Sequence, residues 1–259
     1  MDKFDSLIDK LKSSPISSDE FDNYLKRINR VSDLEIDLEL LQFFGLPIVK
    51  ERDSVYLKTF KNSFKDEEFC IVDIETNGSS PIKHQIIELG AIKYKNQKIV
   101  DRFSSLVYAE HIPDIIVNLT GIQEKDLKNA PSLKKVLHDF KLFLADSVFV
   151  AHNVKFDYNF ISQSLKIVGI EELLNRRLCT VDLARKTIQA DKHGLKFLKA
   201  HLNIEDDNHH RAYSDALSAL KILNECFKNL PTEIKTTEEL IAFASTNTKK
   251  KKKKKVDES

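Results

Sequence analysis

The chain has 259 residues, of which 41% are hydrophobic and only 6 are Gly and 6 Pro, a composition typical of a folded globular protein rather than a fibrous or disordered one. Acids interrupt the amino-terminal segment where a signal peptide would be basic. No apolar run approaches the ~20 residues of a membrane span. We therefore expect a cytoplasmic protein without a membrane partner. The three cysteines are an odd number without a close pair, which indicates reduced packing residues.

The net charge of +1 conceals an uneven distribution. Seven lysines lie within residues 249–259, so residues 1–248 carry 34 basic and 38 acidic side chains, a net of −4. Binding of nucleic acid would therefore rest on local positive patches, metal ions or the tail, and not on the field of the whole protein. The lysine run has nothing apolar to bury, so residues 249–259 are predicted to form a disordered tail.

Residues 1–60 are predicted to form a separate small unit. Three helical patterns are followed by two short strand-like segments, at 4–12, 19–29, 34–44, 48–49 and 54–58. This is the outline of a winged helix, and a plain helical appendage fits the same pattern. Glu35, Asp37 and Glu39 place acids on the third helix, where they would repel phosphate. A protein-contact role is therefore favoured over DNA binding.

Residues 66–230 are predicted to form the main domain. Three successive strands, joined by turn signals, imply an antiparallel start to the sheet, at 68–75, 85–95 and 98–107. Helices and a further apolar strand then alternate, at 133–144, 148–151, 154–168, 194–203 and 212–228. A helix near 236–245 makes residues 231–248 a carboxyl-terminal extension. A mixed sheet flanked by helices, an α/β fold, is the expected architecture.

Two acids stand in the first strand of this domain, within Cys70-Ile-Val-Asp-Ile-Glu75. Asp73 and Glu75 are two residues apart, so both side chains leave the same face of the strand, about 6.6 Å apart. A solvated strand edge would explain an isolated pair of this kind. The apolar neighbours Phe69, Ile71 and Val72 favour a buried central strand, whose acids need compensation.

Two further acids each begin the apolar row of a predicted helix. Asp157 shares its row with Phe160, Ile161, Ser164 and Leu165, and so should point toward the sheet. Asn153 is suited to cap the start of that helix.

Asp215 heads a second inward row, with Ala219, Ile222 and Cys226, and His210 lies five residues before it in the preceding loop. A helix-dipole contact would explain a surface acid better than an inward one.

Carboxylates that converge from three elements would repel one another unless cations neutralised them. Oxygen ligands suit Mg²⁺ or Mn²⁺, and no Cys/His cluster exists for zinc. Two such ions about 4 Å apart can clamp the attacking and leaving oxygens of a displacement at phosphorus. A histidine near neutrality can take the proton from the attacking water. The chemistry indicated is phosphodiester hydrolysis.

Three segments, in this order, resemble the exonuclease motifs of the DEDDh family: Val72-Asp-Ile-Glu-Thr-Asn-Gly78, Ala151-His-Asn-Val-Lys-Phe-Asp157 and His210-Arg-Ala-Tyr-Ser-Asp215. The intervening Asn118-Leu-Thr-Gly-Ile122 with Ala130-Pro131 is similar to the epsilon proofreading subunits of bacterial DNA polymerase III and their relatives. The resemblance covers about residues 68–229. It implies an RNase H-like fold, two bound Mg²⁺ or Mn²⁺ ions, and release of nucleoside 5′-monophosphates from a DNA 3′ end.

By this resemblance the metal-binding acids are Asp73, Glu75, Asp157 and Asp215, and the general base is His210. Other positions match places where the family contacts substrate: Thr76, Thr120, His152, Asn153 and Phe156. Core packing is an equally ordinary role for Phe156, and helix capping for Asn153. His209 lies one place off the motif and is interpreted as a loop residue.

The resemblance also implies a replicative polymerase as partner. A clamp-binding motif is not evident after the exonuclease region, and the string Gln42-Phe-Phe-Gly-Leu46 is only a loose match. An RNase of the same group that trims RNA 3′ ends remains an alternative, because recognition of the 2′-OH cannot be placed from sequence. A catalytically silent binding module is the alternative from another class, and the presence of all five motif residues argues against it.

Overall fold

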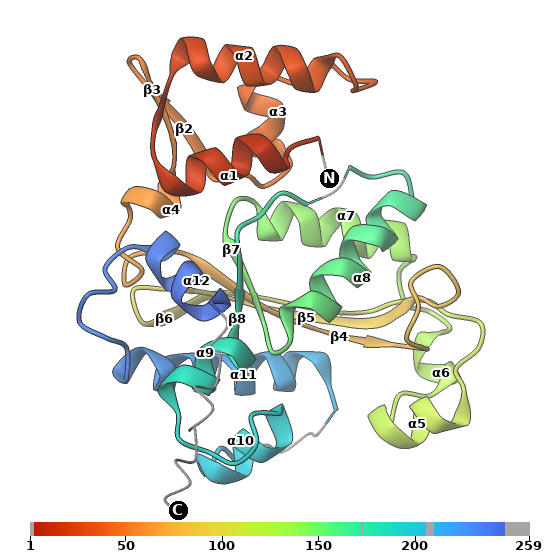
Figure 1. The fold of residues 1–259 in the computed structure, drawn as a ribbon. Helices are drawn as coiled ribbons and strands as arrows, with labels where there is room; N and C mark the ends of the chain where they lie inside the picture. The colour runs from red at the N-terminus through yellow and green to blue at the C-terminus, as the bar shows by residue number, and fades with distance from the viewer. Residues whose placement is uncertain (1–2, 172, 206–209, 247–259) are drawn as a thin grey trace, which may run out of the picture.

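The computed structural model describes residues 3–171, 173–205 and 210–246. The lysine tail and His209 lie outside the described residues. At the amino end, three helices and a small antiparallel sheet of order β1-β3-β2 pack around one apolar core (Figure 1). The elements are α1 (Asp5–Ser13), β1 (Ile16–Ser17), α2 (Ser18–Asn29), α3 (Leu38–Phe43), β2 (Ile48–Glu51) and β3 (Ser54–Leu57). Three helices with a following hairpin is the outline that the sequence predicts.

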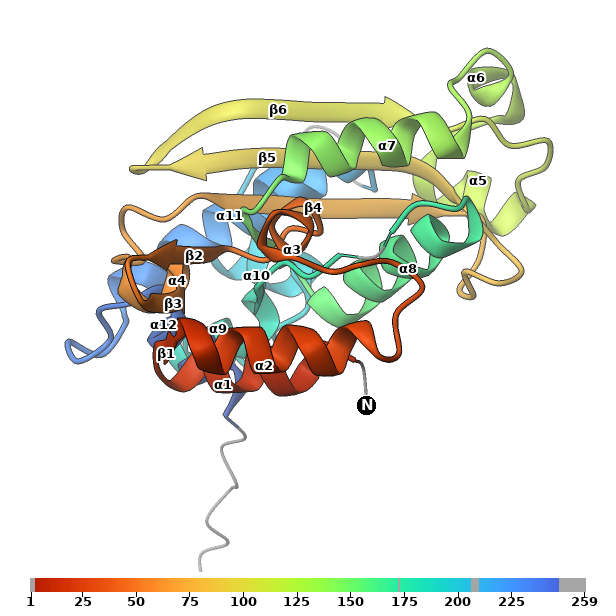
Figure 2. The same cartoon turned by 90° about the horizontal axis from the view of Figure 1, so that it is seen from above.

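The main body is a mixed sheet of five strands in the order β6-β5-β4-β7-β8. The strands are β4 (Phe69–Thr76), β5 (Ile86–Lys95), β6 (Lys98–Leu106), β7 (Val148–Ala151) and β8 (Arg177–Cys179). The first three pair antiparallel, and β7 and β8 add on parallel to β4. The predicted antiparallel start and α/β class are confirmed. In Figure 2, β6, β5 and β4 lie side by side, with α7 on one side of them and α11 on the other.

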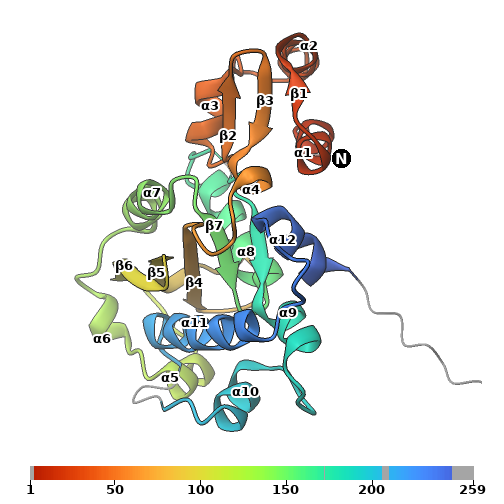
Figure 3. The same ribbon diagram turned by 90° about the vertical axis from the view of Figure 1, so that its left-hand side faces the viewer.

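Helices cover both faces of the sheet (Figure 3). One face carries α7 (Leu133–Leu144) and α8 (Val154–Ile167); the other carries α9 (Thr180–Thr187), α10 (Leu195–His201) and α11 (Ala212–Lys228). Alternate residues of β4 therefore enter different cores: Ile71 packs with α11, whereas Cys70 and Val72 pack with α7 and α8. Short helices α4 (Lys58–Lys61), α5 (Asp114–Thr120) and α6 (Glu124–Leu127) complete the connections. No helix among the described residues is long and apolar enough to cross a membrane.

The loose clamp-motif string does not form an accessible peptide. Phe44 and Leu46 are buried in the amino-terminal core, and the Gln42 side-chain amide donates to the Ile48 carbonyl at 2.8 Å. Phe43 is 55% exposed, but a clamp-binding segment has to present more than one apolar side chain to a partner, and Phe44 and Leu46 are already used for folding. Packing therefore explains most of the string.

A buried ion pair joins three parts of the chain. Arg176, just before β8, donates through Nε and Nη2 to the Glu238 carboxylate at 2.6 and 2.7 Å, and the Thr59 hydroxyl of α4 donates to the same carboxylate at 2.7 Å. Glu238 belongs to α12 (Thr237–Ser245), whose Leu240 and Ala244 enter the core under the sheet. The segment after residue 230 is thus held by both charge and packing.

We expect Glu238→Ala to destabilise the protein by about 3–5 kcal/mol, because it leaves the Arg176 charge buried without a partner. Urea unfolding followed by circular dichroism measures the loss. Asp139→Ala, which removes the exposed pair with Lys135, is the matched control and should cost much less, because exposed ion pairs contribute little to stability. Equal losses in the two variants would contradict the argument.

Candidate active site

Asp73 and Glu75 lie near the carboxyl end of β4, beyond the point where its parallel neighbour stops. The pairing of β4 with β7 ends at Ile71 and Val150, after which the β7 chain turns into α8. The two acids therefore project past the end of β7, next to the start of α8. This is the arrangement that the i, i+2 spacing predicts.

The other two acids come from the first turns of two helices. Asp157 in α8 is 4% exposed and Asp215 in α11 is 8% exposed, so both point inward as their helical rows predict. Gly90 of β5 allows α11 to approach closely, because a Cβ there would lie 2.3 Å from the Tyr213 backbone nitrogen. The amino-terminal ends of both helices, which carry partial positive charge, thus face the acids.

Carboxylate oxygens of Asp73, Glu75 and Asp215 all lie within 4.8 Å of one another. Burial and the charges of Asp157, Glu75, Asp215 and Glu88 raise the pKa of Asp73 well above its ordinary range. Burial, followed by the charges of Asp215 and Glu88, raises the pKa of Glu75 to about 7. Without cations the cluster is therefore partly protonated at neutral pH.

Asp157 stands beside this trio and is coupled to it. Burial raises the pKa of Asp157 to about 8, and the charge of Glu75 also raises it. Hydrogen bonds from the backbone N–H groups of Asp157 itself and Ile74 favour the carboxylate and lower the pKa, but burial is the larger effect. Four acids brought this close together repel one another and are a poor arrangement for stability alone. Oxygen donors at this spacing suit a hard divalent cation, which would replace the protons.

Sequence reasoning missed Glu88, which lies opposite Glu75 in the β5 register and is 2% exposed. Its carboxylate accepts from Arg211 Nη2 at 2.7 Å, from Arg211 Nε at 3.1 Å and from the Ala212 backbone N–H at 3.0 Å. The pair fixes the start of α11, and with it Asp215. A charged residue within the apolar run Ile86-Ile87-Glu88-Leu89 was the available signal.

Lys199 was also missed. It is 5% exposed on α10, and its Nζ lies 3.4 Å from an oxygen of Asp215. A buried lysine is costly unless it is paired, so this contact places one fixed positive charge at the edge of the cluster. Lys199 precedes Asp215 by 16 positions and belongs to no recognisable motif, so only the packing of α10 against α11 brings it to the site.

His210 lies in the loop before α11, as predicted, and is exposed. Its backbone φ of +60° is in the left-handed region, where a residue other than glycine is uncommon. The turn at this point lets the Arg211 side chain go to Glu88 while His210 stays on the outside. The position suits a group that must exchange protons with solvent.

Two threonines that the resemblance implies as substrate contacts differ in their surroundings. Thr76 is half-buried at the end of β4, next to a register irregularity that follows Glu75. The Thr120 hydroxyl donates to the Ile116 carbonyl at 2.9 Å and accepts from the Ile122 N–H at 3.1 Å, so it stabilises the end of α5. Of the two, Thr76 has the side chain with more freedom to meet a ligand.

The second motif contributes a structural histidine. His152 Nε2 donates to the His193 carbonyl at 3.0 Å, so Nδ1 is left to accept from the Thr180 hydroxyl at 2.8 Å. Burial lowers the pKa of His152 to about 4, which keeps the ring neutral. It therefore holds the segment before α10 against β7.

Asn153 and Phe156 follow in the same motif. Asn153 occupies the N-cap position of α8, but its φ of +82° is left-handed and its side chain makes no capping hydrogen bond, so the predicted capping role is wrong. Asparagine tolerates the left-handed backbone conformation, which explains why this residue type occupies the position. Phe156 is 39% exposed and its ring lies 5.7 Å from that of Phe160, which leaves one face open to a ligand.

A mixed five-stranded sheet with inward acids at the end of its central strand defines an RNase H-like nuclease fold. The chain belongs to the exonuclease family (RNase_T), which it matches over residues 70–223. This confirms the predicted 3′→5′ exonuclease at the level of the family. The matched region contains every predicted site residue, from Asp73 to Asp215.

Relatives of this chain include DNA polymerase III PolC-type proteins. The protein of Clostridium perfringens is 40% identical over 192 residues, which are 73% of this chain and 13% of that protein. The protein of Halalkalibacterium halodurans is 39% identical over 153 residues, 58% of this chain and 11% of that protein. The chain thus spans about an eighth of the length of these relatives.

Among solved structures, Escherichia coli exonuclease I in complex with a dA16 oligonucleotide has a TM-score of 0.57 at 15% identity, covering 64% of this chain and 42% of that one. Cell-death related nuclease 4 has a TM-score of 0.54 at 16% identity, covering 63% and 64%. At these identities the comparison establishes the shared fold, and it confirms the RNase H-like architecture.

In the absence of metal, we expect the protein to lose stability as the pH rises from about 4 to about 8. The folded state keeps protons on Glu75 and Asp157 up to about pH 7 and 8, whereas the unfolded chain releases them near pH 4. Stabilisation from this source is complete below the unfolded pKa and is lost as the pH rises through the folded values.

Thermal unfolding in EDTA across this pH range measures the effect, with Asp73→Asn as the control that weakens it. Each kcal/mol corresponds to roughly 2–4 °C in the midpoint. Added Mg²⁺ or Mn²⁺ should restore the midpoint at pH 8 and have little effect at pH 5. A wild-type midpoint in EDTA that rises with pH relative to Asp73→Asn would contradict the argument.

Proposed function

We propose that this chain is a two-metal 3′→5′ exonuclease of the DEDDh type that removes nucleoside 5′-monophosphates from DNA 3′ ends. The observation that carries the proposal is the cluster of inward carboxylates at one end of β4, three of which have oxygens within 4.8 Å of one another. Membership of the exonuclease family supports it. Mg²⁺ and Mn²⁺ are the ions that suit a set of oxygen donors.

In this proposal Asp73, Glu75, Asp157 and Asp215 hold the two ions. The ions, when bound, supply positive charge that stabilises the charge developing on the phosphate. His210 accepts the proton of the attacking water, from a loop where its ring can also exchange with solvent. Glu88 and Arg211 hold the start of α11 so that Asp215 and His210 keep their positions.

Contacts to the terminal nucleotide are assigned to Thr76 and Phe156. Phe156 offers a partly exposed ring on which a base can stack. Thr120 and His152 act through the backbone segments that they hold, since the Thr120 hydroxyl and both His152 ring nitrogens already have partners. Asn153 contributes through its left-handed backbone, which forms the turn into α8.

DNA is the proposed substrate because the relatives are polymerases named for DNA. By the same similarity, the proposed role is proofreading, as an epsilon-like activity beside a replicative polymerase. Trimming of RNA 3′ ends is the second candidate. A catalytically silent module is disfavoured, because all four acids are present, and burial and neighbouring charges raise the pKa values of Asp73, Glu75 and Asp157.

Activity should require added Mg²⁺ or Mn²⁺, and Asp73→Ala should abolish it while the protein stays folded. The reason is that Asp73 lies at the centre of the cluster, next to three other carboxylates. Digestion of 5′-labelled single-stranded DNA, mismatched primer-template and RNA, with and without EDTA, measures the requirement and the substrate together. Undiminished hydrolysis in excess EDTA would sink the two-metal proposal, and faster digestion of RNA would reassign the substrate.

His210→Ala should lower kcat by about 10²–10⁴, the usual range for general acid–base catalysis, with metal binding little changed. A base must be neutral to accept a proton, so the wild-type rate should rise with pH and this rise should disappear in the variant. The measurement is the pH–rate profile of both proteins at saturating metal. His138→Ala, on the exposed face of α7, is the control, and an equal loss there would overturn the assignment.

A further inference from the structure

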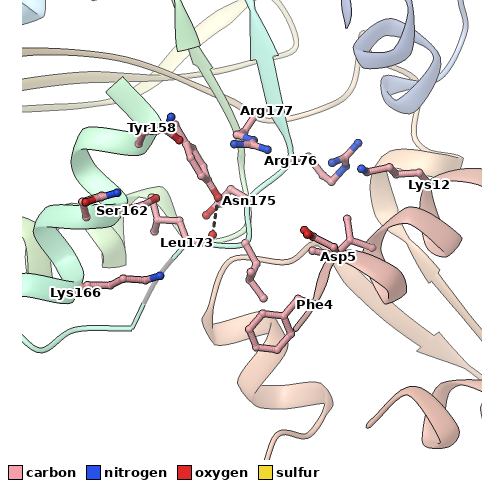
Figure 4. A pocket seen from close by; sticks show the side chains of 14 residues that line it. Phe4, Asp5, Lys12, Tyr158, Ser162, Lys166, Leu173, Asn175, Arg176 and Arg177 are labelled. Atoms are coloured by element: carbon pink, nitrogen blue, oxygen red, sulfur yellow. Dashed lines mark hydrogen bonds between the residues drawn. The ribbon is translucent and has the colours of Figure 1, made fainter. Parts of the chain in front are cut away.

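A cleft lies between the amino-terminal unit and the exonuclease domain, beside the exposed side of α8 (Figure 4). It has a volume of about 280 Å³ and runs between α1 and α8. A second cleft of about 730 Å³ adjoins it at the edge of the sheet, and the two share Lys12, Arg176 and Arg177. Lys155 of α8 lines the second cleft, two residues before Asp157. The pair of clefts is thus continuous with the start of α8.

One side of α8 forms the wall of this groove. Lys155, Asn159, Gln163 and Lys166 recur at helical spacing on the exposed side, while Asp157 and the apolar row face the sheet. From Lys155 to Lys166 the helix rises about 16 Å at 1.5 Å per residue. A stacked strand that advances about 3.4 Å per nucleotide would place some five nucleotides along it.

The charges that line the groove favour a polyanion. Arg177 packs over the Tyr158 ring at 4.6 Å, and neither Arg177 nor Lys155 has an acidic partner among the residues that the structure describes. The Tyr158 hydroxyl donates to the Leu173 carbonyl at 2.6 Å, which fixes the platform beneath Arg177. In Figure 4 the side chains of Lys12 and Lys166 enter the same space from opposite walls. Lys12 Nζ also pairs with the exposed Asp9 of α1 at 2.6 Å, a surface contact that a phosphate can replace.

The acids of the groove are largely occupied by other contacts. Glu238 is bound by Arg176, Asp182 pairs with Arg185 at 2.9 Å, and Glu239 accepts from the backbone N–H groups of Lys235 and Thr236. Asp5 of α1 is the acid of the smaller cleft. An arginine held on an aromatic ring with its donors open is well suited to a phosphate.

We propose that this groove holds the phosphate backbone of a nucleic-acid strand whose 3′ end lies in the active site. The inference rests on the proposed exonuclease function and adds a second, length-dependent contact. Arg177, Lys155, Lys12 and Lys166 bind the phosphates several nucleotides before the end, and α1 of the amino-terminal unit supplies one wall. The structure begins α3 at Leu38 and not at residue 34, so Glu35 and Asp37 precede the helix and only Glu39 lies on it. This acidic segment does not line the groove, so an amino-terminal unit that also binds protein remains compatible.

The test compares Arg177→Gln/Lys166→Gln with the control Lys26→Gln/Lys98→Gln, which removes two exposed charges from α2 and β6. Both pairs are placed in an Asp73→Asn background, so that the strand is not degraded. Fluorescence anisotropy with labelled dT20 at several salt concentrations gives the affinity and its salt slope. Two lost phosphate contacts should reduce the slope by roughly 1.4 and weaken binding at low salt by about tenfold.

The same substitutions without the Asp73 change should leave hydrolysis of dT3 unaltered, since three nucleotides do not reach the groove. Unchanged affinity and slope for dT20 would overturn the inference while leaving the exonuclease proposal intact, and would favour an acidic protein segment as occupant. An equal loss on dT3 would overturn it too, because the charges would then act at the active site. If the wild-type protein cleaved no substrate, the anisotropy measurements with dT20 would still show whether the groove binds the strand.

Discussion

The repulsion among buried carboxylates is the constraint on which the rest of the structure depends. Asp73, Glu75, Asp157 and Asp215 converge at one end of β4, with Glu88 next to them. The pKa values of Asp73, Glu75 and Asp157 rise because burial and neighbouring charges oppose ionisation. A fold selected for stability alone would separate such groups. Here the surrounding elements hold them together, which makes sense if cations complete the site.

The side chains of the protein neutralise only part of the negative charge of this cluster, and they do so on one side of it. Arg211 neutralises Glu88, and Lys199 approaches Asp215, so the fixed positive charges lie on the α10 and α11 side. The first turns of α8 and α11 add their dipoles. Asp73, Glu75 and Asp157 have no cationic side chain as a hydrogen-bond partner among the described residues. The uncompensated charge is thus concentrated on the acids of β4 and α8, where a bound ion has the most to neutralise.

Local periodicity was enough to predict where each acid points. The i, i+2 spacing in β4 and the apolar rows that follow Asp157 and Asp215 depend only on residues within a few positions of each acid. Glu88 with Arg211 is different, because the two lie 123 positions apart and meet only once β5 and α11 have packed. The contact of Lys199 with Asp215 and the hydrogen bonds of His152 likewise depend on neighbours that no local pattern names. The three-residue strand β8 was too short to give a period of its own.

Residues outside the region that matches the exonuclease family are also part of the packed structure around the sheet. The match covers residues 70–223, yet Arg176 inside it is neutralised by Glu238 outside it, and Glu238 is also held by Thr59 from before it. Leu174 packs into the core of the amino-terminal unit, and its N–H donates to the Phe44 carbonyl at 2.7 Å. Both flanks therefore contact the segment 174–177 that leads into β8.

A displacement of either flank would disturb β8. Because β8 pairs with β7, and the end of β7 sets the start of α8, such a displacement would also change the position of Asp157. The flanks of this chain are for that reason positioned to influence the carboxylate cluster through the sheet, without reaching it directly.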